Sequence, residues 1–222
     1  EFRRVLFRSH WRNTTALFEH ALRVTKGNHV AHKTLADALI EERKFDEGIH
    51  HYHEALKAAP KFAEVYNNLG VAYFKAGQFT NAIEPFRRAV EYKPTYAAAH
   101  KNLGNALVMA GRPAEAIPSY ETALRLQPGF TEARNYLGLA LFKLKRYDEA
   151  IPNYLEALRQ EPALNGARYD LGLIYFRQSK FSEAAEQFTA ILKSNPGDAN
   201  AHFQLGLVLI TQHKTGEADR KS

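Results

Sequence analysis

The chain has 222 residues, of which 45% are hydrophobic and 24% are charged, and its formal net charge at pH 7 is +6. Because it contains no cysteine, the sequence excludes a disulfide framework and thiol chemistry, and it leaves the cellular compartment open. No stretch approaches the ~20 consecutive apolar residues that a membrane-spanning helix needs, so we expect no membrane insertion of this segment.

The two ends of the chain differ from the rest. Residues 1–9, EFRRVLFRS, fit no repeat, and their apolar part is too short for a signal peptide. They resemble a translated sequencing adapter, as do residues 219–222, and both are interpreted as scars that are not native. Residues 1–9 carry a net charge of +2 and residues 219–222 carry +1, so the remaining chain has +3 with both signs interspersed. Such a balance predicts no preference for nucleic acid.

Between these ends, four sequence columns recur every 34 residues. The first column is proline, at Pro60, Pro94, Pro128, Pro162 and Pro196. The second is a Leu–Gly pair, at residues 69–70, 103–104, 137–138, 171–172 and 205–206. The third is a small residue, at Gly48, Ala82, Ala116, Ala150, Ala184 and Ala218, and the fourth is an aromatic residue four positions later, at Tyr52, Phe86, Tyr120, Tyr154 and Phe188. A fixed period carried by independent columns indicates stacked supersecondary units.

Each repeat is predicted to be two antiparallel helices, with the Leu–Gly pair on the first helix and the small and aromatic residues on the second. We expect complete repeats at residues 29–62, 63–96, 97–130, 131–164 and 165–198. Residues 10–28 correspond to the second helix of a truncated repeat, and residues 199–218 to a sixth repeat that stops early in its second helix. The glycine is expected to let two helices cross closely, Gly77 to end a first helix in the αL conformation, and the prolines to end the second helices.

These columns resemble the tetratricopeptide repeat. The resemblance implies an all-α fold, a right-handed superhelical solenoid of antiparallel helix pairs, whose concave side binds extended partners. The first complete repeat departs from the pattern through Ala36, where glycine is usual, and Gly48, where alanine is usual. Since the repeat phase is interrupted at both ends, we expect the chain to be an internal fragment of a longer protein.

The sequence carries no motif for catalysis or phosphate binding: GxxxxGK[ST], GxSxG and HExxH are all absent. In the stretch HHYHE, His50 could share a helix face with His53 or Glu54 at a spacing that suits metal ligands. Metal sites usually need three or four converging ligands, however, so we predict no metal site, no cofactor and no enzyme activity in this chain. The three histidines at the fourth position of the first helix are interpreted as packing residues: His32, His100 and His202.

The candidate binding surface follows from helix geometry. On the first helix of each repeat, the second, fifth, sixth, ninth, twelfth and thirteenth positions lie opposite the Leu–Gly face and are expected to line the concave side. The charges at these positions cancel, and asparagines in the second and third repeats give way to aromatic residues in later repeats. The predicted groove residues are Lys33, Asn67, Asn68, Lys75, Lys101, Asn102, Asn105, Asn135, Tyr136, Lys143, Tyr169, Arg177 and Phe203.

An asparagine side chain both donates and accepts hydrogen bonds, so Asn68 and Asn102 are predicted to hold the backbone of an extended peptide. Tyr136, Tyr169 and Phe203 would then grip apolar side chains of the same ligand. Two alternatives stay open: the asparagines are solvated surface, and the aromatic residues pack between repeats.

The stretches NNLG and KNLGNAL resemble repeats of O-linked N-acetylglucosamine transferase. Asn68 and Asn102 match the asparagine ladder of that family, which breaks here at Tyr136 and Asp170. A carboxylate clamp of the kind that binds chaperone C termini is excluded, because Tyr136, Gly166 and Asp170 stand where an asparagine and two basic residues are needed.

We therefore predict a protein- or peptide-binding scaffold whose partner is a protein or an extended peptide segment. The alternative is a repeat arm of a larger enzyme, such as a membrane-bound or soluble glycosyltransferase, whose catalytic domain lies outside this fragment. The stretch from Trp11 to His32 resembles the junction between a multipass membrane domain and trailing repeats in bacterial proteins. That reading places the repeats in the cytoplasm or periplasm, tethered through preceding sequence, and leaves the oligomeric state open.

Overall fold

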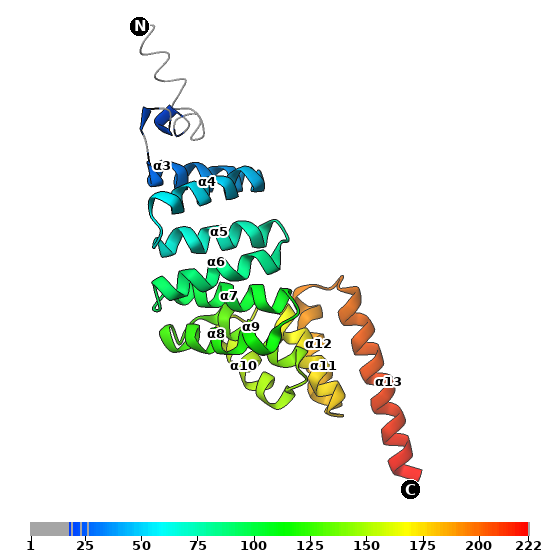
Figure 1. The fold of residues 1–222 in the computed structure, drawn as a ribbon. Coiled ribbons are helices and arrows are strands. Elements are labelled where there is room, and N and C mark those ends of the chain that lie inside the picture. Colours follow the sequence, from blue (N-terminus) through cyan, green and yellow to red (C-terminus); the bar gives the residue numbers. More distant parts are fainter. Residues whose placement is uncertain (1–17, 19, 23, 26, 222) are drawn as a thin grey trace. The chain divides into compact units, whose positions relative to one another are not determined.

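The computed structural model describes residues 18, 20–22, 24–25 and 27–221, and their side chains as far as Lys214. The described residues form helices joined by short turns, with no strand among them, which confirms the predicted all-α fold (Figure 1). The chain divides into two compact units, one ending at Leu126 and the other beginning at Gln127, named here the N-terminal and C-terminal units. The predicted scar at residues 1–9 and most of residues 10–28 lie outside the described residues. In the described part of the chain, no helix is both long enough and apolar enough to cross a bilayer.

Helices pack in chain order within each unit. From residue 29 on, the N-terminal unit consists of α3 (His29–Glu41), α4 (Phe45–Ala58), α5 (Ala63–Lys75), α6 (Phe79–Tyr92), α7 (Ala97–Met109) and α8 (Pro113–Leu126). The C-terminal unit consists of α9 (Thr131–Lys143), α10 (Tyr147–Gln160), α11 (Asn165–Arg177), α12 (Phe181–Ser194) and α13 (Ala199–Lys221). Each odd-numbered helix before α13 packs against the helix that follows it, and successive pairs pack on one another inside a unit. This is the stack of helix pairs that the 34-residue columns predict.

The turn between the two helices of a repeat uses a left-handed backbone residue. Gly77 and Gly111 have φ angles of +75° and +77°, which confirms the αL end expected at Gly77. Arg43, Lys145 and Ser179 adopt the same conformation at the equivalent positions, with φ between 59° and 62°. A residue with a Cβ is disfavoured there by roughly 1–2 kcal/mol, so in these three repeats the packing of the two helices outweighs a local cost.

The repeated glycine makes room for an aromatic ring. A Cβ on Gly70 would lie 2.6 Å from a ring carbon of Phe86, and one on Gly104 would lie 2.5 Å from the Tyr120 ring. The sequence suggested close contact between helix backbones, whereas the structure places the buried ring of the second helix over the glycine. In the first complete repeat Gly48 provides the space instead, because a Cβ there would lie 2.6 Å from Cδ1 of Ile40.

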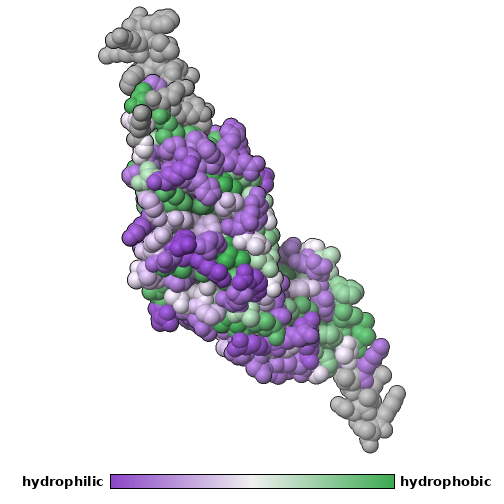
Figure 2. All heavy atoms as spheres, viewed as in Figure 1, coloured by the Kyte–Doolittle hydropathy of each residue, from purple (hydrophilic) through white to green (hydrophobic). Residues whose placement is uncertain are grey.

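The last helix differs from the prediction. The sequence predicts that residues 199–218 form a first helix and the start of a second one, but α13 continues without interruption from Ala199 to Lys221. A Cβ on Gly206 would meet nothing within 4 Å, and Ser222 occupies the aromatic column. Among the described side chains, no ring covers this glycine. Figure 2 shows apolar residues gathered on this helix, next to the grey atoms of the C-terminal end.

Candidate functional site

A polar network joins the first two repeats of the N-terminal unit. Lys33 on α3 donates to Oδ2 of Asp37 at 2.9 Å and lies 3.5 Å from Oε1 of Glu64 on α5. Nδ2 of Asn68 on α5 donates to Oδ1 of Asp37 at 3.1 Å, and the Tyr52 hydroxyl donates to the same oxygen. The hydrogen bond to Asp37 raises the pKa of the Lys33 ammonium. Asp37 is thus the shared acceptor that ties α3, α4 and α5 together.

The network continues through asparagine side chains to the third repeat. Nδ2 of Asn67 donates to Oδ1 of Asn68 at 3.4 Å, and Nδ2 of Asn102 on α7 donates to Oδ1 of Asn67 at 3.0 Å. Lys33, Asp37, Asn68, Asn67 and Asn102 are named here the polar ladder. Asn67 is only 7% exposed and both ends of its amide are hydrogen-bonded inside the ladder, so it is a buried link and not an open groove position.

Asn105 faces the core of its own helix pair. Its Oδ1 accepts a hydrogen bond of 2.8 Å from the buried Tyr120 hydroxyl, as Asp37 does from Tyr52. Where the second helix carries phenylalanine instead, the same position of the first helix is apolar, with Val71 in the repeat of Phe86 and Leu173 in that of Phe188. This pairing of tyrosine with a polar partner is visible in the sequence, although the sequence analysis did not use it.

In the fourth repeat the buried tyrosine hydroxyl has its acceptor on the next repeat. The buried Tyr154 hydroxyl donates at 2.7 Å to Oδ2 of Asp170 on the next first helix, while the ninth position of its own repeat is Leu139. Burial raises the pKa of the Asp170 carboxyl, and the Tyr154 hydroxyl and Lys143 act in the opposite direction. Burial and the neighbouring carboxylate raise the pKa of Tyr154 as well.

In the C-terminal unit, two of the predicted groove residues are tied to neighbouring side chains. The Tyr169 ring lies edge-on to Phe188 at 5.7 Å, and its hydroxyl accepts a hydrogen bond of 3.3 Å from Gln204. Arg177 donates to the Tyr147 hydroxyl at 2.6 Å, and its guanidinium lies 5.5 Å from the centre of the Phe142 ring. These contacts favour the alternative in which Tyr169 packs between repeats.

The remaining predicted residues differ in exposure. Phe203 on α13 is 64% exposed. Lys75 and Lys143 are exposed, whereas Lys101, Asn135 and Tyr136 are half-buried. Four of the predicted groove residues belong to the polar ladder: Lys33, Asn67, Asn68 and Asn102.

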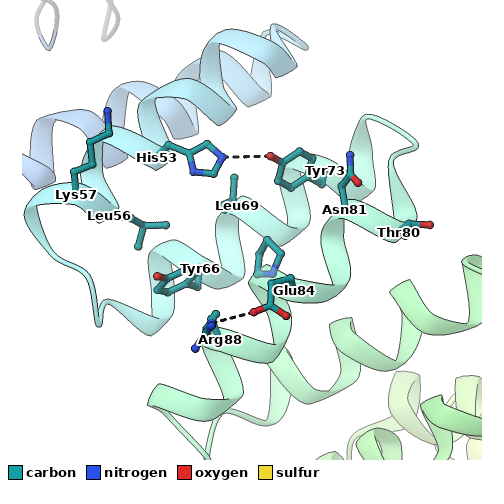
Figure 3. Close-up of a pocket in the computed structure, with 11 residues that line it drawn as sticks. His53, Leu56, Lys57, Tyr66, Leu69, Tyr73, Thr80, Asn81, Glu84 and Arg88 are labelled. Carbon is teal, nitrogen blue, oxygen red and sulfur yellow. Dashed lines mark hydrogen bonds and ion pairs between the residues drawn. The ribbon is translucent and has the colours of Figure 1, made fainter.

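A pocket of about 730 Å³ lies on another face of the N-terminal unit, between α4, α5 and α6 (Figure 3). Leu56 and Leu69 line it together with Tyr66, and the imidazole Nε2 of His53 lies 3.2 Å from the Tyr73 hydroxyl. Burial lowers the pKa of His53. This pocket is not visible in the sequence, because its walls combine side chains from both helices of a repeat and from the preceding second helix.

The histidine-rich stretch of α4 is split between different neighbours. Nδ1 of His51 lies 3.0 Å from Nδ1 of His32, while His53 turns toward Tyr73 and His50 is exposed. The part of the chain that the structure describes holds no group of three or more His, Cys, Asp or Glu side chains that could bind a metal ion.

The fourth position of the first helix has a specific role that the sequence analysis did not identify. Nε2 of His100 donates to the Pro94 carbonyl at 2.9 Å, and His202 makes the same bond to Pro196. In the two repeats between them the fourth position is an arginine that makes the equivalent bond. Arg134 donates to the Pro128 carbonyl, and Arg168 donates to the Pro162 carbonyl. These side chains secure the loop between repeats.

The paired helices, the glycine under an aromatic ring and the proline-ended second helices recur through the chain. The family model described as tetratricopeptide repeat matches residues 33–99, 101–165 and 169–218, which is more than half of the chain. The chain belongs to the tetratricopeptide repeat family.

Solved structures, among them one described as a tetratricopeptide repeat (TPR) protein, share this fold. YrrB, described as a TPR protein with an unusual peptide-binding site, is 23% identical with a TM-score of 0.73, over 84% of this chain and 96% of that one. MamA is 28% identical with a TM-score of 0.70, over 74% and 96%. MamA from Desulfovibrio magneticus RS-1, residues 41 to the end, is 19% identical with a TM-score of 0.72, over 79% and 99%. Among curated protein sequences no match was found.

Proposed function

We propose that the chain is a protein- or peptide-binding scaffold and that the polar ladder of the N-terminal unit is its binding surface. The observation that carries the proposal is the hydrogen-bonded row from Asp37 through Asn68 and Asn67 to Asn102, which crosses three successive first helices. A TPR protein that binds an extended segment needs polar groups at regular intervals across its repeats, and this row supplies them.

The ladder has hydrogen-bonding capacity left for a ligand. Asn102 uses one of its two amide hydrogens in its bond to Asn67 and has a second N–H to offer, whereas Asn68 bonds to Tyr52 as well as to Asp37. A peptide carbonyl is the complementary acceptor. Because the amides are already held by their neighbours, little side-chain freedom is lost on binding, and this preorganisation favours affinity.

The charges beside the ladder favour a ligand without strong net charge. Lys33 is paired with both Asp37 and Glu64, so one positive charge meets two negative ones and only a single net negative charge remains in this group. The solved structures are consistent with such a role, since YrrB is described as having a peptide-binding site. We extend to this chain only the general role of a scaffold for peptides or proteins.

The test compares a ladder variant with a matched control on a peptide array. The double variant Asn68→Ala and Asn102→Ala should weaken all ligand peptides about equally, since backbone hydrogen bonds carry no sequence information, and each lost bond should cost ~0.5–1.5 kcal/mol. Asn81→Ala is the control, because this exposed asparagine on α6 bonds only to Gln78 among the described contacts. A ladder variant that binds the array like the parent would exclude this surface.

The second candidate is a substrate-guiding arm of a larger enzyme. It is favoured by the positions of Asn68 and Asn102, which match the asparagine ladder in the resemblance to O-linked N-acetylglucosamine transferase. The discriminating observation is the uninterrupted coding sequence upstream of Trp11. Apolar membrane spans or a catalytic domain there would favour the arm, and further repeats would favour the free scaffold.

A further inference from the structure

The pocket between α4, α5 and α6 has an apolar floor and a tyrosine at each end (Figure 3). Leu56 and Leu69, which are 8% and 2% exposed, line it together with the buried Pro85. Tyr66 and Tyr73 are half-buried and lie two helical turns apart on α5, so both rings share a face of that helix with Leu69. The rise of an α-helix separates the two tyrosines by ~10.5 Å along its axis. This part of the pocket is named here the tyrosine groove.

The tyrosine pair is particular to the second repeat. Of the repeats in this sequence, it alone has tyrosine at both the fourth and the eleventh position of the first helix. The third repeat has His100 and Leu107 there: the histidine bonds to the Pro94 carbonyl, and the leucine is only 2% exposed. Tyr66 makes an aromatic contact instead, since its ring lies 5.5 Å from that of Tyr92.

At the next repeat junction, the equivalent of this groove is crossed by an ion pair. His53 on α4 and Asn81 on α6 stand on the two walls of the pocket. Their equivalents in the following repeats, Arg87 and Glu115, lie 3.7 Å apart and join α6 to α8. His53 is directed to the Tyr73 hydroxyl, at 3.2 Å, so the space between the walls stays open (Figure 3).

The charged side chains at the rim are paired within their own helices. Lys57 donates to Glu54 on α4. On α6, Arg88 donates to both Glu84 and Glu91 at 3.0 Å. Two positive charges therefore meet three negative ones, and the rim has little net charge with which to attract a strongly charged ligand.

Two hydrogen-bond donors beside the groove are available to a ligand. In the described part of the chain the Tyr66 hydroxyl has no hydrogen-bond partner, and Arg88 uses Nε and Nη1 but not Nη2. The matching ligand is apolar, carries little charge and offers carbonyl acceptors. A proline-rich segment has these properties, because proline has no N–H and the backbone carbonyls of a polyproline II helix are not bonded within it.

We infer that the tyrosine groove binds a proline-rich segment of a partner protein in the polyproline II conformation. This helix rises ~3.1 Å per residue with three residues per turn, so prolines three residues apart share one side at a distance of ~9.3 Å. That distance matches the separation of Tyr66 and Tyr73, so one proline ring packs on each tyrosine with Leu69 between them. Grooves lined by aromatic side chains recognise proline-rich segments in this way. The site shares no residue with the polar ladder and is additional to it.

The probe is a fluorescein-labelled decapeptide of proline and serine with a proline at every third position. The control peptide has the same composition, with no two prolines three residues apart. Affinities for the full chain are measured by fluorescence anisotropy. We expect saturable binding of the first peptide and at least tenfold weaker binding of the control, because only the first places a ring on each tyrosine. Equal affinities, or no binding of either peptide, would overturn the inference.

A double variant of two exposed residues closes the groove without changing its floor. His53→Arg combined with Asn81→Glu copies the Arg87–Glu115 pair of the next junction. The first peptide should bind at least tenfold more weakly, while the thermal midpoint stays close to that of the parent. Glu121→Arg is the matched control, because it adds an arginine at the equivalent exposed position of α8 and should bind like the parent. Full binding by the double variant would contradict the site.

A third variant tests the spacing of the two rings. Tyr73→Leu copies Leu107 of the third repeat and removes one of the rings. The preference for the first peptide over the control should then fall at least threefold, a ratio that a general loss of stability does not change. An unchanged preference would show that the Tyr73 ring is not contacted, which contradicts the proposed pairing of prolines with tyrosines.

The ladder variant separates this site from the polar ladder. Asn68→Ala with Asn102→Ala should bind the proline-rich peptide like the parent, because neither residue lines the groove. If the ladder variant loses the peptide and the closed variant keeps it, the peptide is held by the ladder and the inference is wrong.

Discussion

Equivalent positions of the first helices carry different chemistry in the two units. In the N-terminal unit Asp37, Asn67 and Asn68 hydrogen-bond to one another or to the next first helix. In the C-terminal unit Tyr169 and Leu173, which replace Asn67 and Asp37 in the repeat, belong to an apolar cluster with Phe188. The backbone plan is the same, so the difference lies in which side chains reach their neighbours. A hydrogen-bonded position depends on a specific partner, whereas an apolar position needs only volume and burial, and the variants below test this distinction.

The largest expected effect compares two glycines at the same repeat position. Gly104→Leu should destabilise the N-terminal unit by ~1–3 kcal/mol, because the new side chain overlaps the Tyr120 ring. Gly206→Leu, in the C-terminal unit, should instead stabilise by up to about 1 kcal/mol, because the new side chain meets nothing within 4 Å and leucine has the higher helix propensity. Denaturant titration followed by circular dichroism measures both. Equal losses in the two variants would show that the glycine position is restricted by something other than the ring.

A second pair of variants tests the partner dependence of the polar ladder. Asp37→Leu copies the apolar ninth position of the fifth repeat, and it should destabilise by ~1–3 kcal/mol because the Tyr52 hydroxyl and Asn68 lose their acceptor. In that background Tyr52→Phe should cost less than it does in the parent, since the hydroxyl no longer has a bond to lose. A double-mutant cycle of unfolding free energies measures the coupling, which we expect to be ~1 kcal/mol. Additive losses would show that the two side chains are independent.

Smaller effects are expected at the turns, where the two units use the same backbone conformation. Lys145→Gly should stabilise the C-terminal unit by about 1 kcal/mol, because its φ of 61° favours glycine. Gly111→Ala should destabilise the N-terminal unit by a similar amount, since its φ is 77°. Thermal midpoints of both variants, compared with the parent, check the opposite signs. Two shifts of the same sign would contradict the assignment of αL strain.

The smallest expected effect is on the pH dependence of stability. In the C-terminal unit it comes from a carboxyl group, Asp170, and in the N-terminal unit from an ammonium group, Lys33. Burial raises the pKa of Asp170 above its usual 3.8, so the folded state holds this proton more tightly than the unfolded state does. The contribution of Asp170 to stability is therefore present below pH 3.8 and is lost as the pH rises through the folded pKa. Asp170→Asn should flatten this dependence, because asparagine can still accept the Tyr154 hydrogen bond without a charge to bury. Hydrogen exchange of α10 and α11 between pH 4 and 7 follows it.

Lys33 is the counterpart in the N-terminal unit. Its pKa is raised above 10.5 by Asp37, so its contribution is fully present below that pH and is lost as the pH rises through the higher folded pKa. Lys33→Met should remove this alkaline loss and leave the acidic dependence of α10 and α11 unchanged. An acidic dependence that also disappears in Lys33→Met would show that the two groups are coupled.

The helix pairs could be predicted from residue columns because local rules act on each repeat alone. Glycine adopts the left-handed conformation of a helix end without steric cost, as at Gly77, and proline stops a helix by its own geometry. The groove residues were harder to predict, since helical periodicity shows which face a residue occupies but not what meets it. Asn67 illustrates this limit: its position on the face was inferred, while its burial depends on Asn68 and on Asn102, 35 residues away.

The sequence by itself determined the all-α class, the 34-residue helix pair, the turn conformation at Gly77 and the family, because each depends on short-range sterics or on a column that repeats. Only the tertiary structure decided what the glycines accommodate, which groove residues bond to each other, and that α13 continues past residue 213. Those features depend on whether a particular ring or amide reaches a particular neighbour. The two glycines show this: the ring of Phe188 covers Gly172, whereas nothing in the described residues lies within 4 Å of a Cβ on Gly206.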